Sequence, residues 1–204
     1  MNYFSYVVAR DYGFAPNPFF GICTLATCKP DIRNKAQIGD WIFGTGSVAL
    51  SCRYKLIYAM QVTDKITYDE YWENPLYQNK KPIMYGSLAQ MYGDNIYHQK
   101  DNNWIQADSH HSNGDGSTNY SNLNRDTNSE SVLISNNFYY FGKGYINIPN
   151  ELIANVCKER QGFKYIDEIV AKTLLEYLSN NYDLGYYANP IQFENFKRHD
   201  GIKS

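Results

Sequence analysis

Residues 54–63 read Tyr54-Lys55-Leu56-Ile57-Tyr58-Ala59-Met60-Gln61-Val62-Thr63, and this stretch decides the fold class. Large apolar side chains at every second position alternate with a mixed set. A period of two is typical of a β-strand with one strongly apolar face. We therefore predict a strand here. The following segment begins with Thr67 and carries Glu70 three positions later, which is the signature of a helix capping box and predicts a short helix.

Other strands are expected mainly in the N-terminal part of the chain. Apolar and aromatic runs predict strands over residues 3–10, 41–47 and 104–106. Two further apolar runs flank Asn136-Asn137, so residues 132–141 are expected to form a hairpin. Residues 11–21 contain two prolines and two glycines, which favour an ordered loop. Residues 109–131 contain almost no apolar side chain and are also expected to be loop.

Helices are expected mainly toward the C-terminus. Pro30 favours one short helix, and Pro149 opens a longer one that Gly162 ends. A further helix is predicted over residues 167–181, with a stripe formed by Ile169, Val170, Leu174 and Leu178. Strands that come first and helices that come last indicate the α+β class.

Length and charge bound the function. The chain has 204 residues, enough for one domain with or without an appended helical piece. Its formal net charge of −2 gives no global field that would attract nucleic acid or a membrane surface. No apolar run approaches the roughly 20 residues of a membrane span, and the N-terminus does not resemble a signal peptide. We therefore expect a cytoplasmic protein without a membrane partner.

The four cysteines are Cys23, Cys28, Cys52 and Cys157. In a cytoplasmic chain they are expected to be free thiols. The spacing of Cys23 and Cys28 is wrong for a zinc knuckle, and no second pair follows. We interpret the cysteines as small buried hydrophobic residues and expect neither a metal nor a cofactor.

Residues 108–116 form the candidate functional loop and read Asp108-Ser109-His110-His111-Ser112-Asn113-Gly114-Asp115-Gly116. Three interpretations are open. First, His110 or His111 could act as a general acid or base near neutral pH, with Asp108 orienting it. Second, Asp108, a histidine and Asp115 could bind a metal, and adjacent histidines in an extended segment would point opposite ways. Third, the run could be a flexible polar excursion.

Four short segments carry a resemblance to a known family. They are Gly13-Phe14-Ala15-Pro16-Asn17-Pro18-Phe19, Cys23-Thr24-Leu25-Ala26-Thr27-Cys28-Lys29-Pro30, Gly39-Asp40-Trp41 and Asp108-Ser109-His110-His111. Through them residues 3–148 resemble the second of the nucleotide modification associated domain families. These families are found in bacteria and phages beside systems that modify nucleic-acid bases. The resemblance implies a nucleotide or nucleobase ligand and names no reaction.

The order of the first elements also resembles the PUA-like superfamily, which includes the ASCH, EVE and YTH domains. Gly39 to Phe43 and Tyr54 to Val62 carry this resemblance. It implies an α+β, PUA-like fold with a mixed or antiparallel, barrel-like sheet over residues 1–148. The C-terminal helices over residues 149–204 are then expected to pack on that sheet as an extension, with a homodimer through these helices as a possible assembly.

A nucleobase in such a fold would be held by stacking and by hydrogen bonds to its polar edge. Asn17 could read that edge, because an amide both donates and accepts. The candidates for stacking are Phe14, Phe19, Trp41 and Trp104.

A phosphate on the ligand could meet the basic residues Lys29 and Arg33, which lie around the short helix after Pro30 together with Lys35. A solvated helix face is the alternative interpretation of this group. Ser109 and Asp115 complete the set of ligand-binding candidates.

We predict that the chain recognises a nucleotide or modified nucleobase, as a module in a base-modification or phage-defence setting. The first alternative is an enzyme of hydrolase or transferase type that acts on a nucleobase or nucleotide through His110 or His111 with Asp108. The second is a protein-interaction module whose C-terminal helices dock a partner. The sequence contains no P-loop, nucleophile elbow, HExxH motif or Cys-His deaminase signature, which weakens the expectation of an enzyme.

Overall fold

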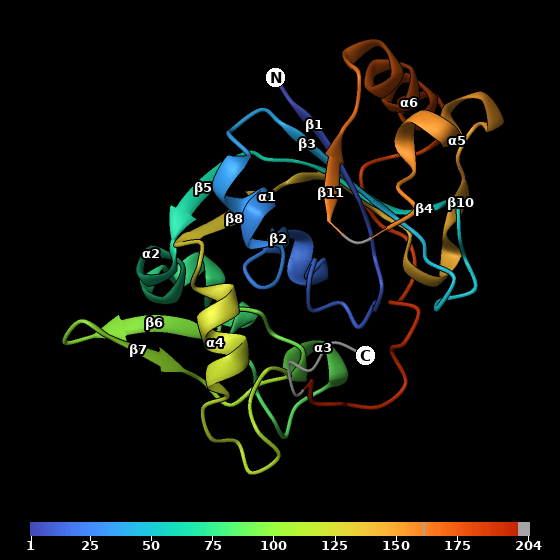
Figure 1. Cartoon of the computed structure of the whole chain (residues 1–204). Coiled ribbons are helices and arrows are strands. Elements are labelled where there is room, and N and C mark those ends of the chain that lie inside the picture. The colour runs from blue at the N-terminus through green and yellow to red at the C-terminus, as the bar shows by residue number, and fades with distance from the viewer. Residues whose placement is uncertain (161, 200–204) are drawn as a thin grey trace. The chain divides into compact units, whose positions relative to one another are not determined.

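A computed structural model describes residues 1–160 and 162–199 (Figure 1). The chain forms two compact units that interleave along the sequence. The first unit contains Met1–Asp11, Ala36–Thr63 and Ser135–Gln192. The second contains Tyr12–Lys35, Asp64–Ile134 and the segment that begins at Phe193. No helix within the described ranges combines the length and the apolar character that a membrane crossing requires.

The first unit is built on a seven-stranded mixed sheet. Its path runs through β11 (Phe163–Tyr165), β1 (Tyr3–Val7), β3 (Trp41–Thr45), β4 (Lys55–Gln61), β9 (Asn137–Tyr140) and β12 (Gly185–Tyr186), and β10 (Ile146–Asn147) pairs with β4. The pairs β1–β3 and β9–β12 are parallel, and the other pairs are antiparallel. Within the described residues the path is open at β11 and β12, so the expected barrel-like closure of the sheet is not confirmed, and the PUA-like fold stays a prediction.

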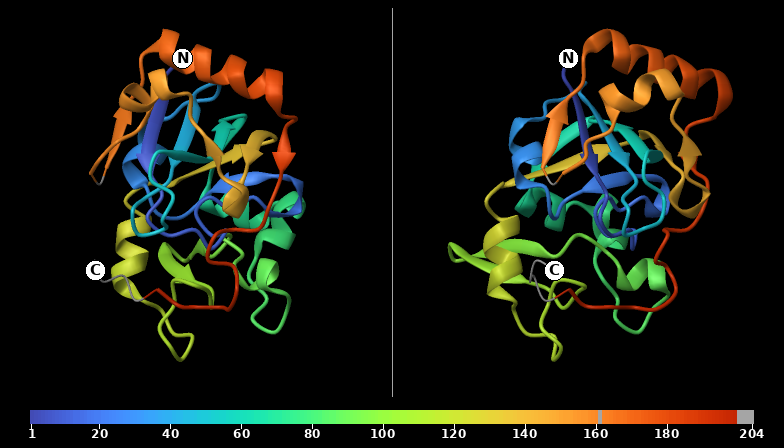
Figure 2. Two further views of the ribbon diagram at one scale, coloured as in Figure 1. Left: turned by 90° about the vertical axis from the view of Figure 1, so that its right-hand side faces the viewer. Right: turned by 45° about the vertical axis from the view of Figure 1, so that its right-hand side comes forward.

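The C-terminal helices α5 (Asn150–Val156) and α6 (Glu168–Asn181) belong to the first unit and lie against its sheet (Figure 2). Leu174 and Leu178 are buried in the same core cluster as Phe43 on β3. The predicted stripe is wrong at Ile169, which is 76% exposed because Ala171 instead faces the core. The domain boundary at residue 148 stays a prediction, and residues 161 and 200–204 of the expected extension lie outside the described residues.

The second unit contains a three-stranded sheet in the order β2 (Cys23–Leu25), β8 (Ser131–Ser135) and β5 (Asp64–Thr67), and a two-stranded ribbon of β6 (Tyr97–Lys100) and β7 (Asn103–Gln106). Four short helices accompany them: α1 (Pro30–Lys35), α2 (Tyr68–Glu73), α3 (Leu88–Met91) and α4 (Tyr120–Asp126). The predicted capping box at the start of α2 is confirmed, with Thr67 and Glu70 bonded reciprocally. The chain also forms three-ten turns at Phe19–Gly21, Pro75–Lys80 and Gly142–Gly144.

The core of the second unit combines aromatic rings with buried polar groups. Tyr68, Tyr71, Tyr92 and Tyr97 are all buried within it. Their hydroxyl groups need partners there, because an unpaired polar group away from water costs free energy. Tyr71 accordingly donates to Asp94 at 2.8 Å. These tyrosines therefore fill the core and tie its segments together.

A buried lysine anchors the proline-containing loop. The ammonium group of Lys80 donates to Asn17 O at 3.0 Å, to Asn17 Oδ1 at 2.7 Å and to Ile22 O at 2.6 Å. Burial lowers the pKa of Lys80 to about 8, although Asp94 acts in the opposite direction. All three protons of the ammonium group are satisfied, so Lys80 fixes residues 17–22 as part of the fold.

Three predicted elements differ from the structure. β8 and β9 do not form the expected hairpin, since Ile134 pairs with Asp64 whereas Phe138 pairs with Met60 in another sheet. Only Asn136 separates the two strands, too short a connection for a two-residue hairpin turn. The helix α5 ends at Val156, well before Gly162, and α4 lies in the segment expected to be loop.

The burial of α6 gives a first prediction. Leu174→Ala should reduce the free energy of unfolding by about 2–5 kcal/mol, because the fully buried side chain leaves a cavity in the first unit. Ile169→Ala on the same helix is the matched control and should change it by less than about 0.5 kcal/mol. Urea denaturation of both variants measures the difference, and equal losses would contradict the orientation of α6.

Candidate functional site

Three titratable side chains meet in the second unit although they are distant in sequence. Cys28 follows β2, His111 follows β7, and Asp126 is the last residue of α4. Cys28 Sγ lies 3.9 Å from His111 Nε2, and His111 Nδ1 lies 2.7 Å from Asp126 Oδ2. His111 and Asp126 are buried, whereas Cys28 is half-buried. A thiol, an imidazole and a carboxylate thus follow one another as nucleophile, base and orienting group do in covalent catalysis.

The backbone at Cys28 adopts a conformation that non-glycine residues rarely occupy. Its φ is 55°, and that of Lys29 is 42°. Such strain persists only where the surroundings over-determine it, and it concentrates at functional sites. Here the N–H of Cys28 donates to Asp126 Oδ1 at 3.0 Å, and its carbonyl accepts from Arg33 Nε at 2.8 Å. The peptide groups on both sides of Cys28 are therefore held by hydrogen bonds to the side chains of Asp126 and Arg33.

Asp126 is the centre of this network. In addition to His111 and the Cys28 N–H, its carboxylate accepts from the Tyr97 hydroxyl at 3.0 Å and from Arg125 Nε at 3.2 Å. Its backbone carbonyl accepts from Arg33 Nη2 at 2.5 Å. The carboxylate is fully buried, so these donors replace the water that it loses.

The charges of the three groups support one another. Burial opposes ionisation of the Cys28 thiol, but neighbouring His111 and Arg125 outweigh it and lower its pKa below the ordinary value. Burial likewise opposes the charged form of His111, but Asp126 and Cys28 raise its pKa to about 9. Burial opposes ionisation of Asp126 as well, but His111, Arg125 and Arg33 hold its pKa well below its usual range. The arrangement therefore shifts Cys28 and His111 toward a thiolate beside an imidazolium.

The histidine pair lies in a turn. Ser112 N donates to Ser109 O at 3.1 Å. The His110 and His111 rings are consequently 5.4 Å apart at an interplanar angle of 27°, rather than on opposite sides as an extended segment would place them. His110 contacts the carbonyl of Lys197 through Nδ1, whereas His111 is the histidine that reaches the carboxylate.

The proline-containing loop and the histidine loop are in contact. The ring of Phe14 lies 4.8 Å from that of His110 and 4.6 Å from that of His111, edge to face. Phe19 is buried in the core of the second unit and contacts Phe193. The side chain of Asn17 is occupied by Lys80 and by the carbonyl of Tyr92. Asn17 therefore shapes the loop.

The other candidates have different surroundings. Asp108 pairs with Arg198 and does not orient a histidine, because Asp126 takes that place. Asp115 is exposed and accepts from Ser117, and Ser109 is buried against Ser112.

Arg33 is completely buried. It donates to the carbonyls of Cys28, Asp126, Ser129 and Ser131 and to Tyr68. Lys29 adjoins Cys28 and is half-buried. Trp41 belongs to the core of the first unit, where it stacks on Phe43.

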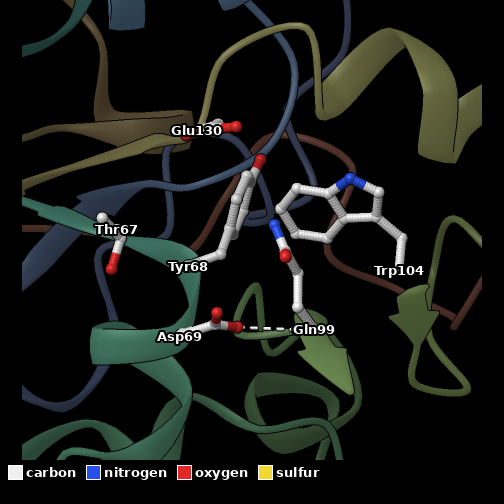
Figure 3. Close-up of a pocket in the computed structure, with 6 residues that line it drawn as sticks. All are labelled: Thr67, Tyr68, Asp69, Gln99, Trp104 and Glu130. Atoms are coloured by element: carbon white, nitrogen blue, oxygen red, sulfur yellow. Dashed lines mark hydrogen bonds between the residues drawn. The ribbon is translucent and has the colours of Figure 1, made fainter. Parts of the chain in front are cut away.

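A pocket of about 110 Å³ lies in the same unit (Figure 3). Its two aromatic walls are Tyr68 and Trp104, whose ring centroids are 5.5 Å apart. The side-chain amide of Gln99 points between them, while its backbone N–H donates to Asp69 at 2.6 Å. Thr67 and Glu130 complete the lining. The Tyr68 hydroxyl donates to Ala26 O at 2.6 Å and lies 3.3 Å from Asp126 O, so one ring connects the pocket with the network around Asp126.

The family model described as nucleotide modification associated domain 2 matches residues 1–197. The chain belongs to this family. Neither a curated protein nor a solved structure matched it. The match extends beyond residue 148, so helices α5 and α6, which the resemblance did not cover, lie within the family region as well.

The same three residues of this nucleotide modification associated domain could hold a metal ion. Their ligand atoms all lie within 4.8 Å of one another. Thiolate and imidazole ligands would favour zinc. However, the Asp126 carboxylate already accepts from four donors and binds His111 through Nδ1. An ion would therefore have Cys28 Sγ and His111 Nε2 as its protein ligands, a smaller set than structural zinc sites use.

Sequence reasoning missed Cys28 and Asp126 as members of the site. The sequence predicts a buried hydrophobic role for Cys28, a description that suits Cys23, Cys52 and Cys157, all of them buried. Asp126 lies in α4, which buries mostly polar side chains and so lacks a hydrophobic period. The available signal was Asn119, which caps α4 by accepting from Asn122 N.

The electrostatics of the site predict how Cys28 reacts. With iodoacetamide, the pH midpoint of Cys28 alkylation should lie below that of the same thiol in the denatured chain, since only the thiolate reacts. His111→Gln removes the positive neighbour while burial remains, so the midpoint should rise and the rate at pH 7 should fall at least about tenfold. Peptide-resolved mass spectrometry separates Cys28 from Cys23, whose pKa burial raises to about 12. Superimposable pH profiles of Cys28 alkylation in the unmodified chain and in His111→Gln would contradict the thiolate–imidazolium pair.

Proposed function

We propose that the chain is an enzyme of nucleotide modification whose nucleophile is the thiolate of Cys28. One observation carries the proposal: Cys28 Sγ, the His111 ring and the Asp126 carboxylate are in sequential contact at 3.9 and 2.7 Å. The enzyme alternative weighed from the sequence paired a histidine with Asp108. The geometry supports His111 with Asp126 instead. The family, shown by the match over residues 1–197, supports a link to nucleotide modification through its description.

The reaction that this arrangement suits is acyl transfer from a nucleotide-linked ester or amide. The Cys28 thiolate attacks the acyl carbon, and a carbon–sulfur bond forms. The bond to the leaving oxygen or nitrogen breaks with its electron pair, and the His111 imidazolium supplies the proton that the leaving group takes up. Neutral His111 then removes a proton from water or an acceptor alcohol or amine, which attacks the thioester and regenerates thiolate and imidazolium.

Asp126 positions the other two groups. Its Oδ2 accepts from His111 Nδ1, which directs Nε2 toward the sulfur. Its Oδ1 accepts from the Cys28 N–H, which fixes the backbone that carries the thiol. Because a buried carboxylate stabilises the charged imidazole next to it, Asp126 favours the ion pair of His111 with Cys28. Asp126 acts through its neighbours and does not itself contact a substrate.

Two acetylated nucleotides test this proposal: N4-acetylcytidine 5′-monophosphate as an amide and 5-acetoxymethyl-2′-deoxyuridine 5′-monophosphate as an ester. With one of them, acid-quenched protein should carry an acetyl group on Cys28, and multiple turnovers should release acetate. Cys28→Ala should abolish both signals. His111→Gln should lower the turnover rate by about 10²–10⁴-fold, the range of general acid–base catalysis.

Cys157→Ala is the matched control, since that thiol lies in the core of the first unit, and it should turn over like the unmodified chain. Turnover by Cys28→Ala at an undiminished rate, or acetylation of another residue in its place, would refute the nucleophile. Activity that tracks bound zinc and disappears with chelator would assign the three residues to a metal instead.

The second candidate function is recognition of a nucleobase without chemistry, the leading interpretation of the sequence. The pocket lined by Tyr68 and Trp104 favours it, because Trp104 is a candidate for stacking on a base and lies at the pocket wall. Gln99, Asp69 and Glu130 would supply hydrogen-bonding groups for a base edge. A defence setting and a protein-docking role for the C-terminal helices remain predictions of the resemblance and the sequence.

Recognition predicts a measurable loss at Trp104. If a base stacks there, Trp104→Leu should weaken the binding of cytidine or adenosine 5′-monophosphate by about 1–3 kcal/mol. Ile105→Ala on the same strand is the control, because its side chain is 39% exposed and does not line the pocket. Calorimetric titration measures both affinities, and equal affinities for the two variants would exclude stacking at this wall.

A further inference from the structure

Arg125 lies beside Cys28, and its hydrogen bonds leave one guanidinium nitrogen without a partner among the described residues. Arg125 Nε donates to Asp126 Oδ1 at 3.2 Å, and the Cys28 N–H donates to the same oxygen at 3.0 Å. The guanidinium and the residue that carries the thiol therefore share one acceptor atom. Arg125 Nη2 is shielded from solvent and has no hydrogen-bond partner among the described residues. A buried donor without a partner is costly, which indicates that an acceptor from elsewhere completes it.

A second cation lies next to the residue that carries the thiol. Lys29 follows Cys28 directly and shares its left-handed backbone conformation. Burial lowers the pKa of the Lys29 ammonium group, whereas neighbouring Cys28 acts in the opposite direction. Arg33 cannot contribute, since its guanidinium is used by backbone carbonyls and by Tyr68.

We propose that Arg125 and Lys29 form a cationic subsite that binds an anionic group of the substrate, a phosphate or a carboxylate, next to Cys28. This inference deepens the proposed function, because it names the substrate class as an anion that reacts at the thiol. A guanidinium suits oxyanions because it presents paired donors in one plane, and an ammonium adds a point charge. The sequence suggests Lys29, Arg33 and Lys35 as contacts for a phosphate. In this proposal Lys29 remains such a contact, and Arg125 instead of Arg33 supplies the guanidinium.

The subsite is testable without knowing the substrate, by comparing anionic and neutral alkylating agents. The ratio of the Cys28 rates with iodoacetate and iodoacetamide is measured in the folded chain and divided by the same ratio in the denatured chain. The folded chain should favour iodoacetate at least threefold at low ionic strength, and added salt should diminish the preference. Arg125→Gln and Lys29→Gln should each reduce the preference at least twofold.

Two further variants serve as matched controls. Arg125→Lys keeps the charge and should retain most of the preference, which separates charge from shape. Lys100→Gln removes an exposed cation on β6 and should leave the ratio unchanged. A normalised ratio near one in the unmodified chain, or a preference that both Gln variants retain, would overturn the subsite. A Cys28 that resists both reagents at every pH would overturn the proposed nucleophile itself, so the two failures are distinguishable.

Competition identifies the source of the anion. Inorganic phosphate, acetate and chloride are compared at matched ionic strength as inhibitors of iodoacetate alkylation. Stronger inhibition by phosphate than by acetate assigns a phosphate-bearing substrate, and the reverse assigns a carboxylate. If all three anions slow the reaction equally, they act only by screening, and the built subsite is refuted.

Discussion

The second unit depends on the hydrogen bonds that the Asp126 carboxylate accepts. This carboxylate is fully buried, and its two oxygens accept from a histidine, a tyrosine, an arginine and a backbone N–H. A buried carboxylate with fewer donors would be strongly destabilised, so every donor is constrained by the others. The last turn of α4, the loop after β2 and the histidine turn are thereby held in one arrangement. Stability and the geometry of the candidate site have the same physical origin.

Arg33 extends this arrangement and explains why the unit tolerates so much polarity inside. Its guanidinium donates to four backbone carbonyls, which lie at the end of α4, at the start of β8, in the connection between them and in the loop before α1. Loop carbonyls removed from water need such donors, because short helices and strands leave many peptide groups unpaired. Arg33 and Lys80 therefore satisfy carbonyl groups of irregular backbone, as hydrogen bonds between strands do in the sheet of the first unit.

The sequence predicted the elements that depend on local signals. The alternation in residues 54–63, the capping box at Thr67 and the amphipathic stretch at 167–181 all correspond to β4, α2 and α6. It did not predict α4, whose buried residues are Asn122, Leu123 and Asp126, because hydrophobic periodicity cannot report a helix that is anchored by hydrogen bonds. The candidates Phe14 and His111 are in contact, but the sequence did not indicate Cys28 and Asp126 as the partners of His111. Contacts between residues 28, 111 and 126 depend on tertiary structure that no local pattern encodes.

Activation of the thiol and attraction of an anionic substrate follow from one distribution of charge. The chain as a whole is slightly negative, yet Cys28 has His111 and Arg125 as positive neighbours that favour its thiolate. The same potential would draw an anion to the site. A bound anion would in turn offset part of that potential and raise the thiol's affinity for protons. The nucleophilicity of the thiolate increases with its pKa while the thiolate fraction falls, so a bound anion has opposite effects on the two. A cationic site therefore favours the thiolate and attracts an anionic substrate through the same charges.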